Sequence, residues 1–214
     1  MTYLEIVNSV LARLRESSVA SVSTTAYSAL LGKLVNDAKR KVEDAWKWDA
    51  LNTTFTITTA SATSNYTVTG IGRRFKDVYL NDTTNDSPIY NMPHQWIRDQ
   101  QQLSTVQNGN PIYYAWNGNN GTDSKIELYP TPNGVYTLKM QAYVPQADLS
   151  ANGDVITIQP EAVIQLAYAM ALVERGEDGG LSSSEAYGLY NGILSDQIAI
   201  EASRQDDNDC WVAV

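Results

Sequence analysis

The sequence predicts an α+β protein in which a four-helix bundle, formed by an N-terminal and a C-terminal helix pair, carries an inserted antiparallel β domain. Apolar residues recur with a helical period near the start of the chain and again in its last third. Between these regions, short runs alternate between apolar and polar residues and are separated by turn-forming residues, which is typical of antiparallel strands. Two helix pairs that flank such a region pack most simply as one bundle. We therefore expect a helical bundle of residues 1–51 and 154–204, a β-rich domain of residues 52–153 and an extended tail of residues 205–214.

Start signals define the first helix pair. The first helix, residues 2–16, begins at a capping box in which Thr2 and Glu5 each bond the other's backbone amide. Ser23 or Thr24 is expected to cap the second helix. An apolar face repeats every four residues up to the predicted end of this helix, at Leu30, Leu34, Ala38, Val42 and Trp46.

The period changes from helical to alternating after Leu51. Trp46 and Trp48 stand at this change, and we expect both rings to fill the boundary between the helices and the sheet. A short helix is expected from Pro93 to about Gln102. Strands are expected at residues 52–59, 66–68, 75–80, 88–90, 112–116, 125–129 and 135–144.

The second helix pair follows this β-rich region. The third long helix opens at Pro160, which suits the first turn, and stops at Gly176. Ser182 and Glu185 have the spacing of a capping box for a fourth helix, which fades near Arg204.

Composition excludes several classes of protein. With 43% apolar residues among 214, the chain can bury a sizeable core. No apolar run approaches the roughly 20 residues that span a bilayer, and the first residues lack the features of a signal peptide. We therefore expect a protein that is made and assembled in a cytoplasm. Cys210 is the only cysteine, so neither an internal disulfide nor a thiolate metal cluster is expected.

The charge of the chain is unevenly distributed. The formal net charge is −9, and residues 151–214 hold two Lys/Arg against eleven Asp/Glu. Such a balance disfavours affinity for nucleic-acid phosphate. An acidic surface along which DNA passes without binding remains compatible with it.

Catalytic motifs are sparse. His94 is the only histidine, and no nucleophile motif accompanies it. Glu177 and Asp178 stand together in a glycine-rich loop. They form a solvated turn, a cation site or half of a carboxylate pair for glycoside hydrolysis. The sequence therefore predicts neither an enzyme nor a bound cofactor or metal.

Aromatic residues concentrate in the β-rich region. Tyr and Trp are enriched in interfaces, and they also stack on sugars. Arg73 and Arg74 follow a short glycine segment and are expected to brace a carboxylate or a neighbouring subunit. We select six candidates for a subunit or ring interface, namely Arg73, Arg74, Trp96, Trp116, Glu177 and Asp178.

Four stretches that span most of the chain carry a resemblance to a known family. They are residues 35–46, 109–116, 126–138 and 174–180, read as VNDAKRKVEDAW, GNPIYYAW, IELYPTPNGVYTL and ERGEDGG. Their pattern and order resemble the head-to-tail adaptors of short-tailed bacteriophages, also called tail tubular or head-completion proteins. None of the stretches is a catalytic motif.

The resemblance implies a structural protein of the virion, located at the head-to-tail junction and assembled in the bacterial host. It implies a ring, usually of twelve copies, that lies under the portal protein ring and extends the DNA channel. The implied partners are the portal ring, the tail nozzle protein, tail fibres and further copies of the chain. Double-stranded DNA would pass through this ring without specific binding.

The tail combines acidic and apolar residues, which is unlike the polar default of a soluble terminus. One alternative is a segment that is simply disordered. The other is a segment that folds on binding to the portal, with a tryptophan anchor and with aspartates opposite basic groups. The residues concerned are Asp206, Asp207, Asp209, Trp211, Val212 and Val214.

Two other classes of function remain open from the sequence. The aromatic β region could be a carbohydrate- or receptor-binding module. The chain could also be a tail-associated glycoside hydrolase that uses Asp or Glu as acid and base.

Overall fold

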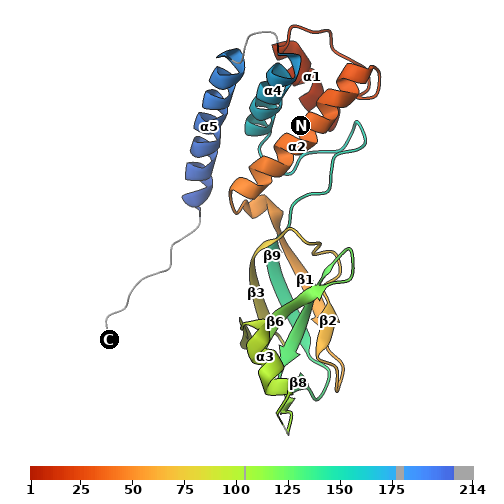
Figure 1. The fold of residues 1–214 in the computed structure, drawn as a ribbon, viewed down its shortest axis with the longest axis vertical. Helices are drawn as coiled ribbons and strands as arrows, with labels where there is room; N and C mark the ends of the chain where they lie inside the picture. The colour runs from red at the N-terminus through yellow and green to blue at the C-terminus, as the bar shows by residue number, and fades with distance from the viewer. Residues whose placement is uncertain (104, 177–180, 205–214) are drawn as a thin grey trace, which may run out of the picture. The chain divides into compact units, whose positions relative to one another are not determined.

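Two units make up the protein in a computed structural model that describes residues 1–103, 105–176 and 181–204. The helical unit contains residues 1–51 together with the chain from residue 145 onward, and the β unit contains residues 52–144. Figure 1 shows the chain leaving the helical unit after the second helix and re-entering it after the last strand. The predicted division into domains, with a β-rich domain of residues 52–153, stays a prediction.

The predicted α+β class is correct, but a four-helix bundle with an inserted antiparallel β domain is wrong. The described residues form five α-helices, and one of them, α3 (His94–Gln101), lies within the β unit. The main sheet has seven strands, and two neighbouring strands in it run parallel. The short helix expected from Pro93 to about Gln102 is confirmed as α3, but the alternation of apolar residues could not reveal that the strands on either side of it pair in parallel.

Four of the helices form the helical unit: α1 (Tyr3–Arg13), α2 (Ala26–Ala45), α4 (Pro160–Arg175) and α5 (Leu181–Ala202). The capping box of Thr2 and Glu5 at α1 is confirmed. The predicted cap of α2 is wrong by one residue or more, because Thr25 accepts the bond from the Ser28 amide. Ser182 does not cap α5 because it lies inside the first turn.

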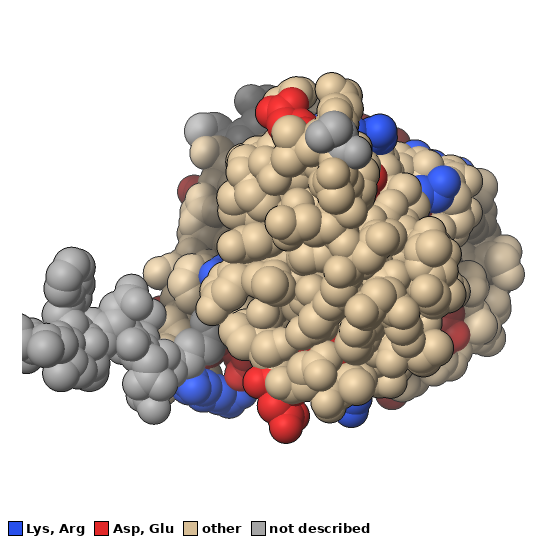
Figure 2. All heavy atoms as spheres, turned by 90° about the horizontal axis from the view of Figure 1, so that it is seen from below, with Lys and Arg blue, Asp and Glu red and all other residues tan. Residues whose placement is uncertain are grey.

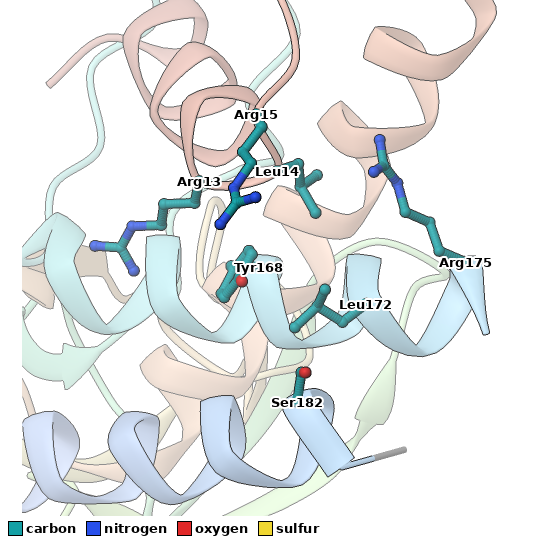
Figure 3. A pocket seen from close by; sticks show the side chains of 7 residues that line it. All are labelled: Arg13, Leu14, Arg15, Tyr168, Leu172, Arg175 and Ser182. Atoms are coloured by element: carbon teal, nitrogen blue, oxygen red, sulfur yellow. The ribbon is translucent and has the colours of Figure 1, made fainter. Parts of the chain in front are cut away.

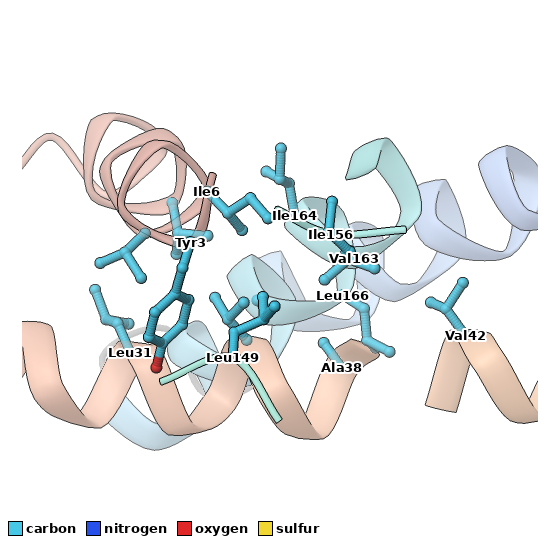
Figure 4. Close-up of a cluster of buried hydrophobic side chains, with 14 of the residues drawn as sticks. Tyr3, Ile6, Leu31, Ala38, Val42, Leu149, Ile156, Val163, Ile164 and Leu166 are labelled. Carbon is cyan, nitrogen blue, oxygen red and sulfur yellow. The ribbon is translucent and has the colours of Figure 1, made fainter. Parts of the chain in front are cut away.

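α4 is the centre of the helical unit rather than one of four equal partners. Both α1 and α2 pack against it, and α5 packs mainly on its other side. Small and branched residues bury nearly the whole circumference of α4, which lets three helices approach it closely. Figure 4 shows this core, where side chains such as Ile6, Leu31, Val163 and Leu166 converge.

The segment between the sheet and α4 is fastened to α2 by polar contacts. Lys39 Nζ lies 3.1 Å from Glu43 Oε1 and donates at 2.6 Å to the carbonyl oxygen of Gln146. The Asn36 side chain bonds both backbone groups of Leu149, at 2.9 Å each. The same segment contacts the start of α1 through an isolated antiparallel bridge between Thr2 and Val155.

The two boundary tryptophans differ in burial. Trp48 is 4% exposed, and its indole nitrogen donates to the carbonyl oxygen of Val42 at 2.8 Å. Trp46 ends α2 and is only partly buried. Of the two rings, Trp48 is therefore the core residue of the helical unit.

The described residues of the β unit form nine strands. They are β1 (Asn52–Thr58), β2 (Asn65–Thr67), β3 (Lys76–Asp82), β4 (Ser87–Asn91), β5 (Asn108–Gly109), β6 (Tyr113–Asn119), β7 (Ser124–Tyr129), β8 (Thr131–Pro132) and β9 (Thr137–Tyr143). The main sheet has the order β1-β9-β3-β4-β6-β7-β2, while β5 and β8 pair separately. Because α3 crosses over between β4 and β6, these two strands run parallel. One face of the curled sheet holds an apolar core that includes Ile71, Leu80, Ile126 and Leu138.

Candidate interaction surfaces

Two of the predicted interface residues, Trp96 and Trp116, lie on opposite faces of β6. Trp116 belongs to β6 and packs on Phe75, with ring centroids 4.5 Å apart. Trp96 belongs to α3 and meets Tyr113, which projects from the other face because side chains alternate along a strand. The structure therefore does not join the two tryptophans in one surface.

The ring of Trp96 is a packing element rather than an open platform. It meets Tyr113 edge-on at a centroid distance of 5.1 Å and Tyr129 at 5.6 Å, with interplanar angles of 71° and 90°. Such edge-to-face contacts are favourable between buried rings. They hold α3 against the sheet.

Arg73 and Arg74 are exposed and lie in the segment that leads to β3. Phe75 follows them and contacts Trp116, so three of the four described candidates fall in one neighbourhood. The other two candidates, Glu177 and Asp178, and the six tail residues lie outside the described residues.

A buried carboxylate beneath α3 escaped the sequence prediction. Glu127 is 1% exposed, and its Oε2 lies 3.1 Å from His94 Nε2 and 3.2 Å from Asn117 Nδ2. Arg98 Nε lies 3.6 Å from the same oxygen. A carboxylate between the two apolar strand residues Ile126 and Leu128 was the available signal. These groups fasten the helix to the sheet, since buried charges in proteins are normally paired.

Three segments at one end of the β unit carry no charged side chains. Residues 59–64, 105–110 and 130–136 contain no Lys, Arg, Asp or Glu, and we call them the uncharged tip. Hydrogen bonds join them, from the Ala62 amide to the carbonyl oxygen of Pro132 and from the Thr131 amide to that of Gln107. Figure 2 views this end, with uncharged atoms across the centre and charged groups at the margins.

Apolar side chains are exposed on the uncharged tip. Val135 is 68% exposed and Val106 is 39% exposed. The centres of protein interfaces are depleted of charge, and an exposed apolar patch commonly marks a partner site. The sequence signal for this surface was the long run from residue 100 to residue 122 without an ionisable side chain other than tyrosine.

Two exposed tyrosines mark the outer face of the sheet. Tyr79 on β3 and Tyr90 on β4 are 63% and 57% exposed. Their inward neighbours Leu80 and Ile89 are paired in register and buried. This face is where the β unit could offer an aromatic surface to a sugar.

The outer side of α5 exposes two large apolar side chains among small and acidic ones. Leu189 and Ile200 are 64% and 49% exposed. They share one stripe of the helix with small residues, and we call the exposed members of this stripe the α5 stripe: Glu185, Gly188, Leu189, Gly192, Asp196, Ala199 and Ile200. A helix that is apolar on two sides is normally covered on both.

Two searches for other kinds of site gave negative results within the described residues. No group of three or more His, Cys, Asp or Glu side chains there could hold a metal ion. None of the described helices is long and apolar enough to cross a membrane.

Comparison with known proteins identifies one family. A family model with the description SU10 adaptor protein matches residues 1–211. No curated protein matches the chain. The family match therefore covers both units.

Proposed function

The chain belongs to the SU10 adaptor protein family, and on that basis we propose that its copies form a ring that joins the portal of a phage head to the tail nozzle and extends the DNA channel. The family role is that of a structural adaptor in a bacteriophage virion. The family match over nearly the whole chain is the observation that carries this proposal.

Contacts between copies in the ring are assigned to the α5 stripe. Its glycines leave open space beside the helix, since a Cβ atom at Gly188 or Gly192 would meet nothing within 4 Å. A helix or loop of a neighbouring copy could therefore approach closely and cover Leu189 and Ile200. Burying an apolar side chain of this size contributes about 1.5–3 kcal/mol, and a closed ring repeats the contact at each copy.

The uncharged tip is assigned to the nozzle protein. A surface without ionisable groups loses no charge hydration on docking, so uncharged polar and apolar contacts can form at low cost. The portal contact is assigned to the helical unit rather than to the tail that the sequence suggested. DNA passes through the ring without specific binding, in keeping with the net charge of −9.

Assembly from purified components tests these assignments. The chain is mixed with portal rings, then with nozzle protein, and the products are imaged by electron microscopy. Val135→Lys places a charge on the uncharged tip and should prevent addition of the nozzle while portal binding persists. Thr122→Lys is the matched control, because it is exposed beyond the opposite end of β7. Nozzle addition that is unaffected by Val135→Lys would refute the role of the tip.

A sugar-binding role is the second candidate, and the exposed Tyr79 and Tyr90 are the observation that favours it. Glycan-array binding that is lost in Tyr79→Ala or Tyr90→Ala would support this role. If the protein stacks on portal rings but binds no glycan, the sugar-binding role is refuted and the adaptor role remains.

A further inference from the structure

A cavity of about 260 Å³ opens where α1 ends beside α4 and α5. Three arginines surround it together with apolar and hydroxyl side chains, and Figure 3 shows all of its lining residues, Arg13, Leu14, Arg15, Tyr168, Leu172, Arg175 and Ser182. We call it the arginine pocket. Its volume falls below the roughly 300 Å³ at which pockets for small organic ligands begin, so a single side chain or a short peptide fits it better.

Arg15 is held in an unusual backbone conformation. It follows Leu14, the C-cap of α1, with a φ of 60°. Glycine is the usual residue at such a position, because a Cβ atom is strained there. The Arg15 guanidinium has no partner among the described residues, and in Figure 3 it extends toward Tyr168. A strained residue with an unused charge indicates a role outside the fold itself.

The other two arginines are fixed in place. Arg13 donates to the Gln165 side-chain oxygen. Arg175 Nε donates to the Tyr27 hydroxyl at 2.8 Å, and its second nitrogen donates to Glu16 at 2.6 Å. The hydrogen bonds to Tyr27 and then Glu16 raise the pKa of Arg175 above its ordinary value. Glu16 is the one carboxylate among these contacts, so the described residues place three guanidinium groups against one carboxylate at the pocket.

An acidic peptide with an apolar residue matches this lining. Guanidinium groups bind carboxylates by charge-assisted hydrogen bonds, while Leu14 and Leu172 offer apolar contact. Residues 205–214 of this chain, QDDNDCWVAV, place three aspartates directly before Trp211 and Val212. We propose that the arginine pocket binds residues 205–214 of a second copy of this chain.

The reach of the chain excludes the aspartates of the copy's own tail from the pocket. Ser182 lines the pocket from the first turn of α5, and the 22 residues of that helix span about 33 Å. Asp209 follows Arg204 by five residues, and five residues extend at most about 18 Å. The aspartates therefore cannot reach the pocket at the start of their own helix. The pairing must join different copies, as a head-to-tail contact that a ring can close.

Charge argues against a nucleic-acid phosphate as the occupant. Residues 151–214 hold only two cations, Arg175 and Arg204, against eleven carboxylates. The net charge of the whole chain is −9, and this balance disfavours affinity for the phosphates of a duplex.

Peptide binding to the full-length chain tests the inference. A fluorescent peptide of residues 205–214 is titrated with protein, and its anisotropy is followed. Arg15→Glu should weaken binding by roughly tenfold or more, because an attractive charge becomes repulsive. Lys41→Glu is the matched control, since Lys41 is exposed on α2 away from the pocket, and it should leave binding unchanged. Circular dichroism confirms that each variant is folded.

A charge exchange adds a second test. A peptide with Asp206→Lys and Asp209→Lys should bind the Arg15→Glu protein better than it binds the wild type. Equal binding of the natural peptide to wild type and Arg15→Glu would overturn the inference. Binding to portal rings without binding to this chain, or displacement of the peptide by duplex DNA but not by unlabelled peptide, would also overturn it.

This inference rests on the proposed function only in requiring copies that lie side by side. The binding test uses neither portal nor nozzle. Its failure would therefore leave the adaptor function in place, whereas failure of the portal assembly would leave peptide binding measurable.

Discussion

α4 and α5 follow each other in the chain and are both rich in apolar residues, yet they use those residues differently. α4 buries residues around nearly its whole circumference, from Ala162 to Ala171. α5 buries only a few side chains and exposes Leu189 and Ile200. Composition alone therefore does not decide which helix is central. The difference indicates that most apolar side chains of α4 are covered by the same chain. The outer side of α5 is available for a partner.

The largest effect is expected where the interior around α4 holds charge. Lys39 and Glu43 on α2 are 3.1 Å apart and fully buried. Lys39→Met should reduce the free energy of unfolding by about 3–5 kcal/mol, since it leaves a buried carboxylate without its cation. Urea denaturation measures the change. Arg40→Met is the control, because Arg40 is an exposed neighbour bonded to Asp148 and should cost less than about 1 kcal/mol. Similar losses of the free energy of unfolding in Lys39→Met and Arg40→Met would contradict the expected difference between buried and exposed charge.

Leucine truncation compares the two helices directly. Leu166 in α4 is 1% exposed, so Leu166→Ala should cost about 2–5 kcal/mol through lost burial and a cavity. Leu189 in α5 is 64% exposed, so Leu189→Ala should change stability by less than about 0.5 kcal/mol. Equal losses in chemical denaturation would show that the outer side of α5 is part of the fold.

Arg15 offers a variant with opposite effects on stability and binding. Arg15→Gly removes the Cβ strain at a φ of 60° and should stabilise the protein by up to about 1 kcal/mol. The same change should weaken binding of the 205–214 peptide. Thermal unfolding and peptide anisotropy measure the two quantities. If Arg15 had only a structural role, Arg15→Gly would not weaken peptide binding while it raises the stability of the protein.

The smallest expected effect is a loss of stability in acid that comes from two carboxylates of the helical unit, Glu5 and Asp154. Hydrogen bonds from the Thr2 amide and hydroxyl lower the pKa of Glu5, and bonds from the Ser150 and Ala151 amides lower that of Asp154. A lowered folded-state pKa stabilises the protein above the ordinary carboxyl pKa. This contribution is lost as the pH falls through the lowered value. Glu5→Gln should therefore flatten the acid limb of a stability–pH curve, and an unchanged limb would contradict this.

Much of the local structure could be predicted because local rules determine it. The capping box at Thr2, the start of α4 at Pro160 and its stop at Gly176 each depend on residues within one helical turn. The strands were predicted, but their order and direction in the sheet were not. The parallel pairing of β4 and β6 depends on where α3 crosses between them. The bundle was wrong for a similar reason. Helical periodicity shows which face of each helix is apolar. It does not show that the other three helices all pack on α4.

The candidate sites were harder to predict than the fold. Arg73, Arg74 and Trp116 fall in one neighbourhood, but Trp96 lies on the other side of β6. Pairing of Glu127 with His94 joins residues 33 positions apart, so no sequence spacing reveals it. The arginine pocket likewise needs α1 and α4 to meet. By contrast, the uncharged tip has a signal in the sequence, which is the long run of residues without a charged side chain. A search for motifs does not detect such a run.

Ring formation on the portal tests the central claim most directly. Wild type, Leu189→Asp and Asn191→Asp are each mixed with portal rings and imaged by cryo-electron microscopy. Both variants add one charge to exposed positions of α5, but only Leu189 belongs to the α5 stripe. Closed rings stacked coaxially on the portal are expected for wild type and Asn191→Asp, and none for a folded Leu189→Asp. Wild-type protein that stays monomeric beside the portal, or Leu189→Asp rings as complete as those of wild type, would contradict the account.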